Sequence, residues 1–208
     1  MADFINTIDA LGDDAVIDSI INRTITEFKD DTIETVGKYA FYRCTALETL
    51  HLPNATMLDE FSLGYTDSLT DIELPKVTTL GKNSFAGCGV VRLKLPSVVT
   101  APGWVFSGSG SEPMKILDMP KLESIGTRFL GGNFTLKALL LRNTAKVCTI
   151  ADTNSQTISN RTYCYVPRAL VDSYKAATNW SNFAANIRAL EDYTVDGTVT
   201  GELDETKI

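Results

Sequence analysis

Apolar residues recur along this chain in one fixed order, and the stretch Thr32–Pro53 (TIETVGKYAFYRCTALETLHLP) is its best-kept copy. Each copy ends in an L-x-L segment that is typical of a short strand with alternating side chains. These segments end at Pro53, Pro75, Pro96, Pro120 and Arg142, at intervals of 22, 21, 24 and 22 residues. The near-constant interval predicts a repeat architecture in which each unit supplies one strand.

Other apolar positions recur at the same intervals as these segments. An apolar residue stands three positions before each segment, and an aromatic residue or leucine recurs on the return path: Phe41, Leu63, Phe85, Phe106 and Leu130. One unit is too small to bury its own apolar face, so stacked units must share a core. We predict an α/β solenoid, a right-handed leucine-rich-repeat superhelix of about five to six repeats of about 22 residues. One parallel sheet forms its concave face, and the return segments are short and irregular or helical.

The ends of the chain depart from the repeat and predict caps within a single structural domain. Residues 1–31 are expected to form an N-terminal cap of a short helix and a strand, followed by repeats over 32–167. The last unit, 143–166, is degraded. Helical spacing from Leu170 to Leu190 predicts a helical cap over 168–190. The remaining residues, 191–208, are expected to be an acidic tail or linker.

Composition and charge narrow the class of partner. The 208 residues are 44% hydrophobic and carry a net charge of −7, which disfavours nucleic acid and anionic membrane surfaces as partners. No apolar run approaches the roughly 18 residues of a membrane-spanning helix, so we expect no membrane insertion. The N-terminus has no basic start followed by an apolar core, so no signal peptide is predicted.

Candidate catalytic chemistry is sparse. His51 is the single histidine, which excludes histidine-based triads and multi-histidine metal sites. Cys44 and Cys88 occupy equivalent places two units apart, too far for a disulfide, and are expected to be buried thiols. Cys148 and Cys164 flank the degraded unit, and whether they pair stays open. We therefore predict no enzyme, no catalytic residue, no metal site and no cofactor.

The outward positions of the predicted strands are the candidate partner-binding face, because a solenoid offers its sheet to ligands. The row is charged at one end and apolar at the other. A protein or glycan could dock on it, and an unused solvated face would have the same composition. The candidate residues are Thr49, His51, Asp71, Glu73, Arg92, Lys94, Ile116, Asp118, Ala138 and Leu140.

The motif G-x-x-A-F-x-x-C (Gly37, Ala40, Phe41, Cys44), followed by L-x-x-L-x-L-P, resembles the BspA-like, Treponema pallidum-type leucine-rich repeats. The resemblance implies a curved solenoid used for binding, with no catalytic residues to transfer. Members of that family occur on bacterial cell surfaces as adhesins, and similar repeats occur in phage-encoded proteins. We thus expect a non-enzymatic, adhesion-type, protein- or glycan-binding module, extracellular or at the cell surface. The alternative is a structural or host-binding component of a phage particle or surface assembly, and a phage-associated or cytoplasmic location stays open.

Overall fold

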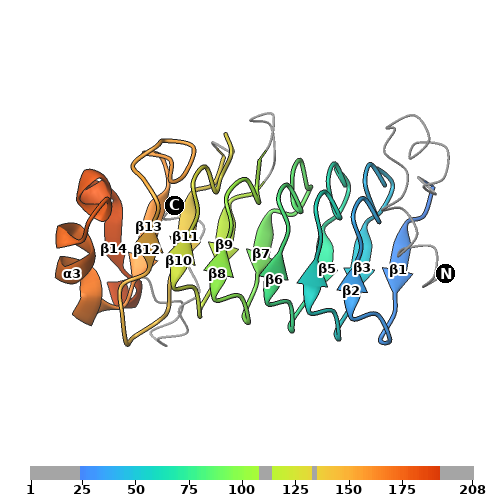
Figure 1. The fold of residues 1–208 in the computed structure, drawn as a ribbon, viewed down its shortest axis with the longest axis horizontal. Coiled ribbons are helices and arrows are strands. Elements are labelled where there is room, and N and C mark those ends of the chain that lie inside the picture. Colours follow the sequence, from blue (N-terminus) through green and yellow to red (C-terminus); the bar gives the residue numbers. More distant parts are fainter. Residues whose placement is uncertain (1–23, 108–113, 133–134, 193–208) are drawn as a thin grey trace.

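A computed structural model describes residues 24–107, 114–132 and 135–192, and in it the chain winds as a parallel-strand solenoid (Figure 1). One side of the solenoid, here called the long-strand side, holds the strands predicted from the five L-x-L segments, together with one strand before them and two after them. These strands are β1 (Glu27–Lys29), β3 (Thr49–His51), β5 (Asp71–Glu73), β7 (Arg92–Lys94), β9 (Ile116–Asp118), β11 (Ala138–Leu140), β13 (Tyr163–Val166) and β14 (Ile187–Ala189). The predicted fold class is confirmed, with successive turns about 22 residues apart.

The repeated leucines form ladders inside the solenoid. Parallel pairing places Leu50 beside Phe28 and Ile72, and Leu117 beside Leu93 and Leu139. The residues that directly follow these strands are buried as well: Leu52, Leu74, Leu95, Met119 and Leu141. The central side chains of these strands pack against those of their neighbours, with Ile72 of β5 only partly buried, and the turns share one continuous core.

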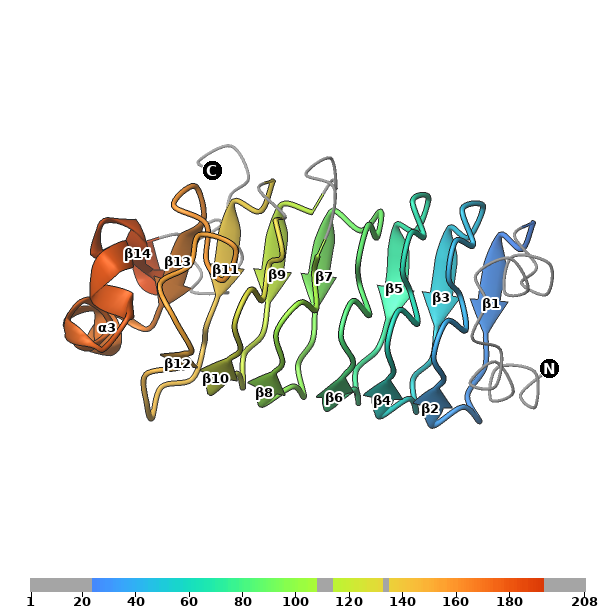
Figure 2. The same ribbon diagram turned by 45° about the horizontal axis from the view of Figure 1, so that its top comes forward.

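The return path holds a second row of strands that the sequence did not predict. These two-residue strands form the short-strand side, at the lower edge in Figure 2: β2 (Thr35–Val36), β4 (Met57–Leu58), β6 (Thr79–Leu80), β8 (Thr100–Ala101), β10 (Ser124–Ile125) and β12 (Thr149–Ile150). The second residue of each is buried. Two residues are too few to show an alternating pattern, so only the stacking of turns reveals them as strands.

Both rows of strands divide at the same turn of the solenoid. Among the described strands, β5 is not paired with β7, and β6 is not paired with β8. The segment before β7 is one residue shorter than in the first unit: one residue lies between Cys88 and Val90, whereas two lie between Cys44 and Leu47. On the other side, Pro102 occupies the place where Gly81 donates its backbone N–H to Leu58. Proline has no N–H, so this bond is lost where β8 would join β6.

The C-terminal cap combines helices with an added strand. It contains η2 (Arg168–Leu170), α3 (Val171–Ala176), η3 (Trp180–Asn186) and, after β14, η4 (Leu190–Asp192). Helical spacing had extended to Leu190, whereas Ile187–Ala189 pairs with β13 in parallel. Ile187 and Ala189 are buried and Arg188 is not, which is the two-residue period of a strand. The helix predicted in the N-terminal cap lies outside the described residues.

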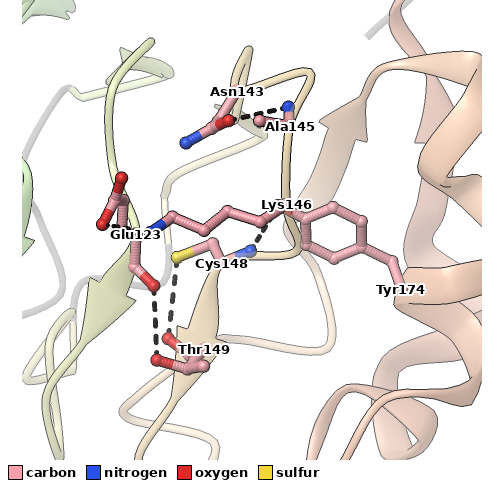
Figure 3. A network of polar contacts seen from close by, with 7 residues as sticks. All are labelled: Glu123, Asn143, Ala145, Lys146, Cys148, Thr149 and Tyr174. Atoms are coloured by element: carbon pink, nitrogen blue, oxygen red, sulfur yellow. Dashed lines mark hydrogen bonds and ion pairs between the residues drawn. The ribbon is translucent and has the colours of Figure 1, made fainter.

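Both backbone groups of Cys148, in the last turn, form hydrogen bonds with side chains of the cap (Figure 3). Its N–H donates to the Tyr174 hydroxyl at 2.9 Å, and its carbonyl accepts from Trp180 Nε1 at 2.5 Å. Beside it, Lys146 pairs with Glu123 at 2.6 Å, and the Thr149 hydroxyl donates to the Glu123 carbonyl. Tyr174 and Trp180 thus satisfy the backbone N–H and carbonyl of Cys148, the residue directly before β12.

Candidate functional site

The outer face of the long-strand side brings the candidate residues together in two parallel rows. Strand register places Thr49 beside Asp71, and His51 beside Glu73. Farther along, β9 lies between β7 and β11, so the rows continue on those strands. The register thus assembles the predicted residues on one face, and the break between β5 and β7 separates the first four from the rest.

The half of this face on β3, β5 and β7 is polar and open to solvent, and we call it the polar half. The Asp71 and Glu73 side chains are 61% and 55% exposed, and Arg92 and Lys94 are exposed on the next strand. His51 is half-buried, with Nε2 2.9 Å from Asp71 Oδ2 and Nδ1 3.7 Å from Glu73 Oε2. The histidine therefore lies between two carboxylates, and a band of acidic residues borders a band of basic ones.

The half on β9, β11 and β13 differs from the expected exposed face, and we call it the apolar half. Ile116, Ala138, Leu140 and Tyr165 are only 2%, 0%, 2% and 1% exposed, and they form a second apolar cluster with Leu190. These side chains lie on the face opposite the main core, because they alternate with Leu117, Leu139 and Cys164. The predicted residues Ile116, Asp118, Ala138 and Leu140 are therefore buried, and a partner cannot reach them in this state.

Asp118 is the one charged group among those four positions. Both its carboxylate oxygens accept from Arg142, at 2.9 Å from Nε and 3.0 Å from Nη2. A bidentate pair of this kind satisfies a buried carboxylate and fixes the geometry of the arginine. The pair explains how an aspartate is accommodated beside an otherwise apolar cluster.

The cysteines are placed as buried thiols rather than as reactive groups. Cys44, Cys88, Cys148 and Cys164 are all free and buried. Burial raises the pKa of the Cys148 thiol to about 12, and it raises the pKa of Cys164 as well. A thiol held in its protonated form is a poor nucleophile and a poor metal ligand. Within the described ranges no group of three or more potential metal-ligating side chains occurs.

A third surface, on the return path, was not found from the sequence. At one position in each of five successive turns a non-glycine residue adopts a left-handed backbone, namely Tyr39, Phe61, Asn83, Trp104 and Arg128, with φ between 53° and 66°. Tyr39 stacks on Phe61 with ring centroids 5.5 Å apart, and the Arg128 guanidinium lies 4.9 Å from the Trp104 ring. A left-handed backbone is uncommon for aromatic residues. The five positions hold different residue types, so the sequence does not indicate this conformation.

The architecture defines the class of protein: a parallel solenoid that displays side chains from successive strands. The family model for the BspA type leucine-rich repeat region matches in six copies, over residues 12–127 and 56–161. The chain belongs to this family. Comparison with curated proteins gives no match.

Among solved structures, the chain is similar to a leucine-rich repeat protein from Bacteroides ovatus ATCC 8483, with 22% sequence identity and a TM-score of 0.52. The match covers 69% of this chain and 40% of that protein, so this chain spans less than half of its length. At this identity the likeness shows the fold alone. Leucine-rich-repeat families are generally non-enzymatic protein-binding modules, and BspA-type repeats often occur in surface proteins. None of the described helices is long and apolar enough to cross a membrane.

Proposed function

We propose that this chain is a non-enzymatic, adhesion-type binding module that holds a protein or glycan ligand on the polar half of its long-strand side. The observation that carries the proposal is the ordered array of exposed charges on adjacent strands. Asp71 and Glu73 stand on β5, and Arg92 and Lys94 stand at the matching positions of β7. The charges on β5 and on β7 belong to two separate parallel sheets of one solenoid. The strand pairing within each sheet holds its own charges in place without a ligand, which lowers the entropy lost on binding.

The array also indicates the charge pattern expected on the surface of the ligand. Acidic and basic bands side by side fit a surface of complementary alternating charge, and such complementarity contributes more to specificity and association rate than to affinity. Binding through this array is therefore expected to weaken as ionic strength rises. The ligand contacts six of the ten predicted residues: Thr49, His51, Asp71, Glu73, Arg92 and Lys94.

The test is a screen of the chain against glycans and host-matrix proteins, followed by matched charge reversals. Glu73→Lys and Lys94→Glu are expected to reduce affinity for any ligand found by about tenfold or more. Glu34→Lys and Lys121→Glu make the same charge changes at exposed positions outside the long-strand side, and they are expected to bind like the wild type. Equal affinity in all four variants would show that the ligand binds elsewhere.

The same screen addresses the alternative role in a phage particle or surface assembly. In that role the partner is another component of the assembly, and free glycans and matrix proteins give no signal. Co-purification of the chain with a particle or a surface layer, and loss of this co-purification in Glu73→Lys, would assign the polar half to assembly instead of adhesion.

A further inference from the structure

Neighbouring turns of the long-strand side share one recurring backbone hydrogen bond, which is absent between β5 and β7. The residue after a long strand donates its N–H to the third residue of the next long strand, at 2.9–3.1 Å, from Asp30, Leu52, Leu95, Met119 and Leu141. Leu74 stands at the same position after β5, but its bond to the Lys94 carbonyl is missing from the described structure. Leu74 is only 3% exposed, so its N–H has lost this partner in a buried place.

The short-strand side lacks a backbone hydrogen bond at the same boundary. The residue after a short strand donates to the second residue of the preceding short strand: Asp59 to Val36, Gly81 to Leu58, Gly126 to Ala101, and Ala151 to Ile125. Pro102 holds this position after β8 and has no N–H to donate. Because Ala151 forms the bond with a Cβ atom in place, the missing N–H of Pro102 accounts for the loss. We call the boundary between β5–β6 and β7–β8 the seam.

Backbone hydrogen bonds continue across the seam on the return path. Asn83 donates to the Trp104 carbonyl at 2.9 Å, and Phe85 donates to the Val105 carbonyl at 3.1 Å. The return path therefore joins the turns on the two sides of the seam, whereas both rows of strands are interrupted there (Figure 2). This arrangement leaves one edge of the solenoid connected and two sides without strand pairing.

Each turn of a solenoid contacts only its neighbours, so the boundary with the fewest interactions opens most readily. At the boundaries on either side of the seam, opening the long-strand side breaks backbone hydrogen bonds. At the seam, opening lets water reach the Leu74 N–H, which has no bond to Lys94 to lose. The half-buried Ser97 hydroxyl donates across the seam to the Pro75 carbonyl at 2.8 Å, and water can replace this bond. Apolar packing opposes opening at every boundary, so the missing backbone bonds distinguish the seam.

We propose that the seam is a hinge: the turns before it and the turns after it form two blocks that open on the strand sides, while the return path holds them together. Asp71 and Glu73 lie on the first block, and Arg92 and Lys94 lie on the second. Opening therefore changes the distance between the acidic and the basic charges of the polar half. The hinge does not depend on the ligand-binding function, because it concerns contacts within one chain.

Thiol labelling measures how often each boundary opens, since all four native cysteines are buried. Leu74→Cys places a thiol at the seam, and Leu52→Cys and Met119→Cys place thiols at equivalent buried positions whose backbone bonds are formed. In the folded 208-residue chain, a maleimide is expected to label Leu74→Cys about tenfold faster or more than either control. Peptide mass spectrometry assigns each label, and reaction of the native thiols reports global unfolding.

Pro102→Ala supplies the missing N–H and tests the cause of the opening. Its N–H is expected to donate to the Leu80 carbonyl, as Ala151 donates to Ile125. Labelling of Leu74→Cys is then expected to slow by about threefold or more, while labelling of Leu52→Cys stays unchanged.

Two labelling results would overturn the proposal. Equal rates for Leu74→Cys and Leu52→Cys in folded proteins would show that the seam opens no more often than a boundary with paired strands. An unchanged rate for Leu74→Cys in the Pro102→Ala background would show that the missing bond does not control opening. A failed ligand screen leaves both results untouched, because labelling involves no ligand.

If a cysteine variant unfolds, hydrogen exchange in the unaltered chain decides the matter. The Leu74 amide is expected to exchange about tenfold faster or more than the Leu52 amide. The Asn83 and Phe85 amides lie on the hinge axis, and they are expected to exchange as slowly as the equivalent amides one turn earlier. Equal protection of Leu74 and Leu52 contradicts the hinge. Fast exchange at Asn83 and Phe85 also contradicts it, because the two blocks would then separate completely.

Discussion

Two buried serines on the return path allow a test of how buried hydroxyl groups affect the stability of the solenoid. Ser62 and Ser84 occupy equivalent positions in successive turns, and both are fully buried. Their hydroxyl oxygens have no hydrogen-bond partner within the described structure. The equivalent residues are Ala40 in the turn before and Val105 in the turn after, both also buried. An apolar residue therefore fits this position of the repeat.

The expected gain follows from the cost of the orphan hydroxyl. Burying a hydroxyl without a partner costs about 1–3 kcal/mol in protein mutational data. Ser→Ala removes that cost and gives up only the packing of one oxygen atom. We expect Ser62→Ala and Ser84→Ala each to raise the free energy of unfolding by about 1 kcal/mol. For a chain of this size, about 1 kcal/mol corresponds to about 2–4 °C in Tm.

A neighbouring threonine provides the control with the opposite sign. Thr66 is equally buried, but its hydroxyl donates to the Leu63 carbonyl at 2.9 Å. Thr66→Val keeps the shape and removes that bond, so it is expected to lower stability by about 1 kcal/mol. Urea unfolding of the three variants, followed by circular dichroism, measures all of these changes. Destabilisation of 1 kcal/mol or more by both serine variants would refute the reasoning, because it would show that the hydroxyls are hydrogen-bonded in solution.

Two further predictions concern the junction between the last turn and the cap. Tyr174→Phe leaves the buried Cys148 N–H without its acceptor, so stability is expected to fall by about 1–2 kcal/mol and amide exchange at Cys148 to accelerate; unchanged exchange would contradict the bond. The pKa of Cys148 is raised by burial from 9.0 to about 12, so the folded state keeps its proton where the unfolded chain loses it. This contribution to stability is present below pH 9 and is lost progressively between pH 9 and 12, and urea midpoints against pH should decline less steeply in Cys148→Ala.

Much of the architecture could be predicted because it depends on the spacing of residues that are close together in the sequence. The interval between Pro53, Pro75 and Pro96 specifies the length of a turn, and alternation around Leu50 and Leu117 specifies which side chains form the core. The length of a turn follows from the recurrence of the same motif, and the choice of core side chains follows from the two-residue period of a strand. The short strands, the added strand Ile187–Ala189 and the left-handed residues escaped because two or three residues carry too little pattern.

For the candidate site, the sequence by itself determined which side chains share the outer face of the long-strand side. It could not determine which of them are exposed. Asp71 and Ile116 stand at equivalent repeat positions, yet one is open to solvent and the other is covered. Exposure depends on what else lies on the face, and that is a contact between residues distant in sequence. Only the tertiary structure decided it, because the repeat pattern encodes the neighbours within the sheet and not the contacts on its outer face, such as that of Leu190 from the cap.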